Sequence, residues 1–225
     1  MKIFAVGMNY REHNKELAHT LYNKEVEGLS AECTQLDEDL SDLTAKPVIF
    51  TKCDTALLRP GAPFFLPAYT KQCEYETELV VRIGHMGRCI PERWVHRYID
   101  AVTVGIDFTA RDLQRQLTKK GLPWDICKGF DGSAAVGEWI PVDEVEDLQN
   151  IHFHLDINGN TVQQGHSADM IHSVKRLVSY ISQFFMLKTG DLIYTGTPAG
   201  VGPVHIDDHL VGYFEDKKVM EFNVK

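Results

Sequence analysis

Apolar and polar positions alternate, or apolar residues run together in short blocks, over most of the chain. This pattern predicts many short β-strands, beginning with residues 1–8. The other expected strands are 48–51, 62–66, 76–83, 101–108, 152–157 and 161–164, with further short strands over the last forty residues. Asn158-Gly159 predicts a tight hairpin between the last two of these, because both residues tolerate a positive φ angle.

Helical periodicity is restricted to a few segments. One expected helix ends near Leu21, a second runs from 109 to 120, and a third runs from 168 to 185. Thr109-Ala-Arg-Asp112 has the form of a capping box, and Gly121 is a stop signal for the helix that would follow. The chain is therefore predicted to be a single domain, 1–225, of mixed, β-dominated α+β class.

Residues 22–46 are the most hydrophilic part of the chain and are strongly acidic. Leu36, Leu40 and Leu43 are spaced as on one face of a helix, which permits a surface helix there. We interpret the segment as an excursion over the body of the protein, with a lid as one role and a solvated charged face as the alternative.

Composition and charge exclude several classes of partner. The 225 residues include 32 acidic and 23 basic ones, for a formal charge of −9, and no Lys/Arg stripe stands out, so nucleic acid is not an expected partner. No apolar stretch is long enough to span a bilayer, and the first residues have no signal-peptide pattern, so a cytoplasmic protein without membrane contact is expected. The five cysteines include no CxxC pair and are expected to be reduced thiols.

The first candidate chemistry lies in Cys73-Glu-Tyr-Glu-Thr-Glu-Leu-Val-Val81. On a strand, Glu74, Glu76 and Glu78 would share one face, with neighbouring carboxylates about 7 Å apart at Cα. Like charges held together near a core raise one another's pKa values unless a cation neutralises them. The pattern thus indicates a metal site, and a solvent-facing edge strand is the alternative.

Asp107 makes the metal interpretation stronger, because it lies in an otherwise apolar strand. An isolated buried charge is very costly, so its carboxylate is expected either to pair with Arg111 or to bind a metal. Glu76, Glu78 and Asp107 together would form an all-oxygen site with no His or Cys, and such a site suits Mg²⁺ or Mn²⁺.

Other polar residues give weaker signals. His13 and Glu16 would share a helix face, where a carboxylate beside an imidazole makes a suitable general base; a surface pair is the alternative. Lys128 would meet an anionic substrate or be a surface lysine. Thr195-Gly-Thr-Pro-Ala-Gly-Val-Gly202 is rich in glycine but lacks the end of a P-loop, so nucleotide binding is not indicated.

A series of motifs extends over almost the whole chain. The segments are Gly7-Met-Asn-Tyr-Arg-Glu-His13, Glu76-Thr-Glu78, Ile106-Asp-Phe-Thr-Ala-Arg-Asp112, Lys120-Gly-Leu-Pro-Trp124, Lys128-Gly-Phe-Asp131 and Gly190-Asp-Leu-Ile-Tyr-Thr-Gly-Thr-Pro-Ala-Gly-Val-Gly-Pro203. In this order they resemble the fumarylacetoacetate hydrolase family, specifically its compact acylpyruvate hydrolase and oxaloacetate decarboxylase branch. The sequence departs from compact members in a longer route to Pro47, which looks like an acidic insertion in the lid region at about 17–46, and in Cys53, where the family commonly has proline.

The resemblance implies a β-sandwich-like roll with flanking helices, usually a homodimer. It implies Mg²⁺ on Glu76, Glu78 and Asp107, and the following further site residues: a catalytic His13–Glu16 pair, Lys128 near the anionic oxygens of the substrate, and Arg111, Gln114 and Thr197 in the substrate pocket.

The expected reaction is metal-dependent cleavage of a C–C bond in a small 2-oxo acid: hydrolysis of an acylpyruvate, decarboxylation of oxaloacetate, or both. The sequence does not choose between them. Two alternatives stay open, namely an isomerase or dehydratase acting on another 2-oxo acid, and a non-catalytic protein that binds metal and anions.

Overall fold

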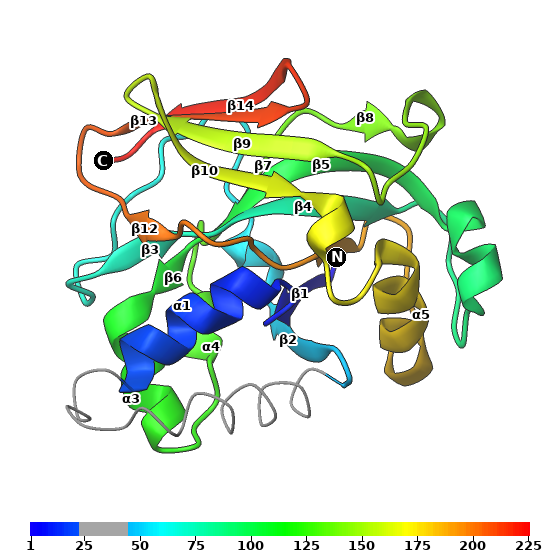
Figure 1. Ribbon diagram of the computed structural model, residues 1–225, viewed down its shortest axis with the longest axis horizontal. Coiled ribbons are helices and arrows are strands. Elements are labelled where there is room, and N and C mark those ends of the chain that lie inside the picture. The colour runs from blue at the N-terminus through cyan, green and yellow to red at the C-terminus, as the bar shows by residue number, and fades with distance from the viewer. Residues whose placement is uncertain (23–44) are drawn as a thin grey trace.

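The computed structural model describes residues 1–22 and 45–225 (Figure 1). The surface helix expected within 22–46 falls on residues outside that description, and the acidic insertion at about 17–46 and the single-domain organisation stay predictions.

The strands are β1 (Ile3–Gly7), β2 (Val48–Lys52), β3 (Cys73–Tyr75), β4 (Thr77–Ile83), β5 (Ile99–Asp107), β6 (Thr109–Ala110), β7 (Ala134–Val136), β8 (Ile140–Pro141), β9 (His152–Ile157), β10 (Asn160–His166), β11 (Leu192–Tyr194), β12 (Gly202–Pro203), β13 (His209–Phe214) and β14 (Lys217–Asn223). The α-helices are α1 (Arg11–Tyr22), α3 (Arg111–Lys119), α4 (Asp125–Lys128) and α5 (Val174–Phe184).

A seven-stranded sheet forms the centre of the fold. Its order is β2-β1-β11-β4-β5-β7, with β8 also paired to β5. β1 runs parallel to β11, and the other pairs are antiparallel. Nearly every side chain of β4 and β5 is buried, so both faces of these strands are covered. This burial explains why their sequences are almost continuously apolar rather than alternating.

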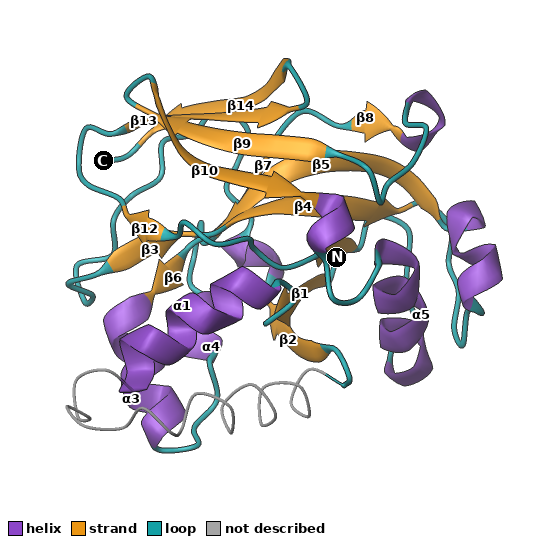
Figure 2. Cartoon of the chain, viewed as in Figure 1, coloured by secondary structure: helices purple, strands orange, loops and turns teal. Residues whose placement is uncertain are grey.

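A four-stranded sheet, β10-β9-β13-β14, packs across this central sheet, and β13, β14 and β9 contact β5 and β4 (Figure 2). A small third sheet, β12-β3-β6, continues from one end. Helices α1, α3 and α4 gather on one side below the sheets, and α5 lies apart from them (Figure 1). The β-dominated α+β class and the sandwich-like arrangement with flanking helices are therefore confirmed. The hairpin turn is confirmed too, with positive φ at Asn158 and Gly159.

Gly105 provides a test of the packing between β4, β5 and β7. A Cβ atom at this position would lie 2.5 Å from the carbonyl oxygen of Ala135 and 2.7 Å from Val80 Cγ2. Gly105→Ala should therefore lower the free energy of unfolding by about 1–3 kcal/mol, as overpacking does. Denaturant titration measures this loss, and Gly7→Ala is the matched control because its new Cβ would meet atoms only at 3.7 Å or beyond. Equal midpoints for the two variants would contradict the packing argument.

Three local predictions were wrong. The strand expected at 62–66 is irregular and makes only an isolated bridge, between Phe64 and Val224. The Thr109 hydroxyl donates to the carbonyl of Asp107 instead of capping a helix, and α3 begins at Arg111 without a side-chain cap. Its end before Gly121, which has φ of 63°, is as expected.

The third error concerns the start of the helix expected at 168–185, because α5 begins only at Val174, after a Ser173 cap. Asn9 explains the delay. Its side chain accepts a hydrogen bond from the His172 N–H and donates to the His172 carbonyl, and its own carbonyl accepts from the Ile171 N–H. These tertiary bonds hold the preceding residues in a non-helical path.

Among the described residues, no helix is both long and apolar enough to cross a membrane. Four of the five cysteines are described, and all four are free thiols: Cys53, Cys73, Cys89 and Cys127.

Candidate metal and active site

Three buried carboxylates converge where β3, β4 and β5 meet. Glu76 lies at the break between β3 and β4, Glu78 lies within β4, and Asp107 is the last residue of β5. The Asp107 N–H donates to the Glu76 carbonyl over 2.8 Å, which holds the two chain segments together. One carboxylate oxygen from each residue lies within 4.8 Å of the others. The structure thus brings together the three residues that the sequence predicted as metal ligands.

Two lysines neutralise part of this charge. Lys128 Nζ lies 2.6 Å from Glu76 Oε2 and 2.9 Å from Asp107 Oδ2 and so bridges the two carboxylates. Lys52 Nζ lies 2.5 Å from Asp107 Oδ1 as an ion pair and donates to the carbonyl and hydroxyl of Ser133. Burial acts to lower the pKa of both ammonium groups. At Lys128 the charges of Asp107 and Glu76 outweigh burial and raise the pKa above its ordinary value, so this group stays protonated. At Lys52 burial prevails.

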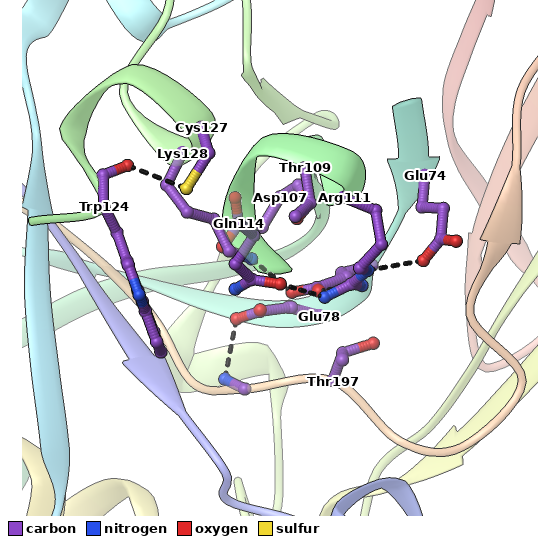
Figure 3. A network of polar contacts seen from close by, with 12 residues as sticks. Glu74, Glu78, Asp107, Thr109, Arg111, Gln114, Trp124, Cys127, Lys128 and Thr197 are labelled. Atoms are coloured by element: carbon purple, nitrogen blue, oxygen red, sulfur yellow. Dashed lines mark hydrogen bonds and ion pairs between the residues drawn. The ribbon is translucent and has the colours of Figure 1, made fainter. Parts of the chain in front are cut away.

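Arg111 is a third buried cation beside these carboxylates (Figure 3). Its guanidinium donates to Glu74 over 2.6 Å, to Glu76 over 2.5 Å and to the side-chain oxygen of Gln114. It makes no described ion pair with Asp107, so the pairing that competed with the metal interpretation is not formed. The carboxylate of Glu74 pairs with Arg111 and is not one of the three converging carboxylates. The reason is that the strand is interrupted between β3 and β4, and these two strands belong to different sheets.

Glu78 differs from its neighbours in having no ion-pair partner among the residues described. Its carboxylate accepts a hydrogen bond from the Gly196 N–H over 2.6 Å (Figure 3). Burial, together with the charges of Asp107 and Glu76, raises its pKa well above the ordinary value. Burial also acts to raise the pKa of Glu76, but Lys128 and Arg111 outweigh it and hold that pKa below its ordinary value.

The balance of charge tests whether a divalent ion fits. In the described part of this cluster, four buried carboxylates face three buried cations. The carboxylates are Glu74, Glu76, Glu78 and Asp107, and the cations are Lys52, Arg111 and Lys128. Glu78 is the one of these four carboxylates that has no ion-pair partner among the described residues. One oxygen from each of Glu76, Glu78 and Asp107 lies within 4.8 Å of the other two, and an all-oxygen donor set suits Mg²⁺ or Mn²⁺. The residues therefore fit such an ion.

His13 and Glu16 lie on α1, beside the carboxylates. His13 is buried, and its Nδ1 lies 3.3 Å from Glu16 Oε2. The Gly200 N–H donates to the carboxylate of Glu16 over 3.0 Å. The hydrogen bond with His13 lowers the pKa of Glu16, burial opposes this shift, and the bond from Gly200 adds to it. This arrangement fixes the orientation of the imidazole, as a general base requires.

A small cavity of about 30 Å³ lies between these groups, with room for roughly one or two water molecules. The predicted site residues that line it are His13, Glu76, Arg111, Gln114, Lys128 and Thr197. The hydroxyl of Thr197 is already engaged, since it donates to the Thr77 carbonyl and accepts from Gln163. The catalytic and substrate-binding roles of these residues stay predictions.

Sequence reasoning missed residues that shape the site. Lys52 is one of them. A comparison of the number of acidic residues in the apolar strands with the number of basic residues nearby would have indicated a further buried cation. Gln163 is another: its side-chain oxygen accepts from the Thr77 N–H, and its amide nitrogen donates to Thr197 and to the Pro198 carbonyl. The loop that begins at Thr195 is a third feature, because its Gly196 and Gly200 N–H groups hold Glu78 and Glu16 in place.

Comparisons with known proteins agree with this fold and show the family. Residues 2–225 match the family model described as fumarylacetoacetate (FAA) hydrolase C-terminal. The chain is 34% identical over 223 residues to the mitochondrial oxaloacetate tautomerase FAHD1 of Mus musculus, covering 99% of this chain and 91% of the relative. It is 37% identical over 215 residues to the oxaloacetate tautomerase YcgM of Escherichia coli, covering 95% and 88%.

A solved structure is similar over the whole chain. It is the crystal structure of fumarylpyruvate hydrolase from Pseudomonas aeruginosa in complex with Mn²⁺ and pyruvate, with a TM-score of 0.83 and 31% identity, covering 100% of this chain and 89% of that one. The chain therefore belongs to the fumarylacetoacetate hydrolase family, as the sequence motifs indicated.

Proposed function

We propose that this chain is a metal-dependent enzyme that hydrolyses the C–C bond of acylpyruvates, decarboxylates oxaloacetate, or does both, by stabilising the enolate of a small 2-oxo acid. The observation that carries the proposal is that Glu76, one of the three converging carboxylates, and His13, which pairs with Glu16, line one small cavity. The Mn²⁺ and pyruvate in the related fumarylpyruvate hydrolase structure support the same chemistry.

Bound at Glu76, Glu78 and Asp107, a divalent ion would supply Lewis-acid stabilisation of the negative charge that develops on the 2-oxo group. The chain's own residues would do the rest. With such an ion the cluster would carry a net positive charge, which attracts a 2-oxo acid anion. The protonated Lys128 lies at the same carboxylates and would stabilise developing negative charge.

For hydrolysis, His13 would accept a proton from a water molecule, and Glu16 would stabilise the charged imidazole. The water oxygen would bond to the distal carbonyl carbon of the acylpyruvate. The bond between that carbon and C3 would then break, with its electron pair left on the pyruvate enolate. His13 would return a proton to C3, so that an acylpyruvate anion and water give pyruvate, a carboxylate and one proton. Loss of CO₂ from oxaloacetate gives the same enolate without water.

A second candidate is tautomerisation of oxaloacetate between its enol and keto forms, a reaction of the isomerase class. The observation that favours it is that two relatives, at 34% and 37% identity, are named oxaloacetate tautomerases. His13 would move the proton between oxygen and C3, and no water would be consumed.

The proposal is tested by turnover of acetylpyruvate and oxaloacetate with purified protein stripped by EDTA, before and after Mg²⁺ or Mn²⁺ is added. We expect pyruvate formation to rise by about 100-fold or more with metal, since Lewis-acid stabilisation contributes several kcal/mol. The ratio of the two rates identifies the dominant reaction. Absence of pyruvate from both substrates, with interconversion of oxaloacetate tautomers followed by ultraviolet absorbance, would replace the first candidate by the second.

We also propose the homodimer that the family resemblance implies. Sedimentation equilibrium should give twice the chain mass of 25.5 kDa, and a mass equal to that of one chain would reject it.

A further inference from the structure

A buried glutamine of the four-stranded sheet reaches the chain segment that carries two of the converging carboxylates. Gln163 lies on β10, directly after the register shift that begins at Thr161, and only 3% of its surface is exposed. A bulge of this kind redirects the side chains that follow it. Here Gln163 is turned inward, whereas the next residue, Gln164, is exposed. The bulge thus places a polar side chain where the four-stranded sheet meets the loop that begins at Thr195.

Both ends of the Gln163 side-chain amide are hydrogen-bonded. Its Oε1 accepts from the Thr77 N–H over 2.9 Å. Its Nε2 donates to the Thr197 hydroxyl over 2.8 Å and to the Pro198 carbonyl over 2.9 Å. A backbone N–H can only donate and a carbonyl can only accept, so these partners determine which end of the amide is oxygen and which is nitrogen. Of the common side chains of this length, only glutamine both accepts and donates in this way.

Thr77 is the single residue between Glu76 and Glu78, and both of its backbone polar groups are held. Its N–H belongs to the peptide group that follows Glu76, and this N–H donates to Gln163. Its carbonyl belongs to the peptide group that precedes Glu78 and accepts from the Thr197 hydroxyl over 3.0 Å. Since Gln163 also donates to that hydroxyl, the three residues form a closed ring of hydrogen bonds.

The orientation of these two peptide groups determines where the carboxylates of Glu76 and Glu78 point, because it sets the backbone angles from which each side chain leaves. One oxygen from each of them lies within 4.8 Å of an oxygen of Asp107. Mg²⁺ requires nearly ideal octahedral geometry, so a small rotation of either peptide group would weaken its binding. Groups that orient metal ligands typically contribute about 10-fold to 100-fold to metal affinity.

We infer that Gln163 is a positioning residue for the metal site. It fixes, directly and through Thr197, the directions from which Glu76 and Glu78 reach a divalent ion. Gln163 is not among the residues that line the cavity beside His13, so it acts through its neighbours and not by contact with substrate. The inference rests on the proposed function, because it concerns the metal which that function requires.

The first experiment measures Mg²⁺ affinity by calorimetry in Gln163→Met. Methionine has nearly the same length as glutamine and makes none of the three hydrogen bonds. We expect the dissociation constant to rise by about 10-fold to 100-fold. Gln164→Met is the matched control, since Gln164 is the next residue on the same strand and is exposed, and its affinity should equal that of the original protein. Equal affinity in the two variants would overturn the inference.

A comparison of two ions separates positioning from a general loss of structure. Ca²⁺ accepts a larger and more variable set of oxygens than Mg²⁺ does. Gln163→Met should therefore weaken Mg²⁺ binding by at least about fivefold more than it weakens Ca²⁺ binding. If the variant only unfolded the site locally, both ions would lose affinity by the same factor, and that result would reject the positioning role.

Thr197→Val provides a second route to the same answer if Gln163→Met does not fold. Valine retains nearly the shape of threonine and removes only the hydroxyl that links Gln163 to the Thr77 carbonyl. We expect a rise of at least about fivefold in the dissociation constant for Mg²⁺, although Thr197 is not one of the predicted metal ligands. If both variants fold, their combined effect should be smaller than the product of the two, because they break one ring of hydrogen bonds. Unchanged affinity in Thr197→Val would contradict the inference.

The outcomes for Gln163 and for the proposed reaction are distinguishable. Weaker Mg²⁺ binding in Gln163→Met, with no turnover of acetylpyruvate or oxaloacetate by the original protein, would retain the positioning role and reject the reaction. Metal-dependent turnover by the original protein, with an unchanged dissociation constant in Gln163→Met, would retain the reaction and reject the positioning role. Failure of the original protein to bind Mg²⁺ or Mn²⁺ would reject both.

Discussion

Glu78→Gln is expected to abolish metal-dependent turnover and, at the same time, to stabilise the metal-free protein. Glu78 is buried without an ion-pair partner among the described residues, and burial raises its pKa well above the ordinary value. A neutral amide of nearly the same shape removes the cost that burial imposes on the Glu78 carboxylate, and no described lysine or arginine loses an ion-pair partner. We expect at least about 1 kcal/mol of extra stability, or roughly 2–4 °C in Tm for a chain of this size.

The same variant should lose the rise in Tm that Mg²⁺ or Mn²⁺ produces in the original protein, because a ligand that binds only the folded state stabilises it by mass action. Turnover should fall by more than about 100-fold, beyond the usual effect of residues that only orient metal ligands. Calorimetric titration with the metal is the direct measurement. An unchanged dissociation constant would remove Glu78 from the site.

Glu74→Gln is the matched control for this prediction. Glu74 is also a buried glutamate on the same stretch of chain, but its carboxylate pairs with Arg111 and does not face the other three. The control should retain metal binding and should lose stability, because a buried guanidinium then loses one partner. The two glutamates should therefore shift Tm in opposite directions.

His13→Ala is expected to reduce acetylpyruvate hydrolysis by about 10²–10⁴-fold and to leave oxaloacetate decarboxylation much less affected. General-base catalysis contributes about that factor, and only hydrolysis needs a water molecule to be deprotonated. Both rates are measured as pyruvate formation in saturating Mg²⁺, with metal affinity as a check that the site is intact.

Glu12→Gln is the control on the same helix, because Glu12 is exposed and pairs only with Lys15 in the described ion pairs. It should change neither rate. Glu16→Gln should give an intermediate loss of hydrolysis, since an amide can still accept the Gly200 N–H but stabilises a charged imidazole less well. Equal loss of both reactions in His13→Ala would show that His13 does not act by activating water.

The sequence was sufficient to predict that Glu76, Glu78 and Asp107 meet, because carboxylates within apolar strands must find a common cation. The alternation of the strand also put Glu74 on the face of Glu76 and Glu78, without making it a ligand, and in the structure its carboxylate pairs with Arg111. No turn residue marks the break after Tyr75. The break arises because β3 pairs with β6 and β12, whereas β4 pairs with β5 and β11. Such pairings depend on residues far away in the chain and leave no local signal.

Lys52 and Gln163 were missed for related reasons. A lysine at the end of an apolar strand has the sequence appearance of a surface residue, and only the tertiary arrangement places it against Asp107. Gln163 follows a register shift in β10, between Thr161 and Gln163. A bulge of this kind changes which side chains face inward, so simple alternation assigns them wrongly. The start of α5 was likewise decided by hydrogen bonds from Asn9 and not by helix propensity.

The position of β1 between β2 and β11 has a consequence for how the protein is made in the cell. β1 ends at Gly7, whereas its parallel partner ends at Tyr194, and the Gly200 N–H that holds Glu16 comes later still. At a translation rate of about 5–20 residues per second, the first strand leaves the ribosome on the order of 10–40 s before this partner is synthesised. The apolar strand β1 therefore has one edge unpaired until β11 has been synthesised. The central sheet can close, and the active site can assemble, only after the chain has been made as far as Gly200.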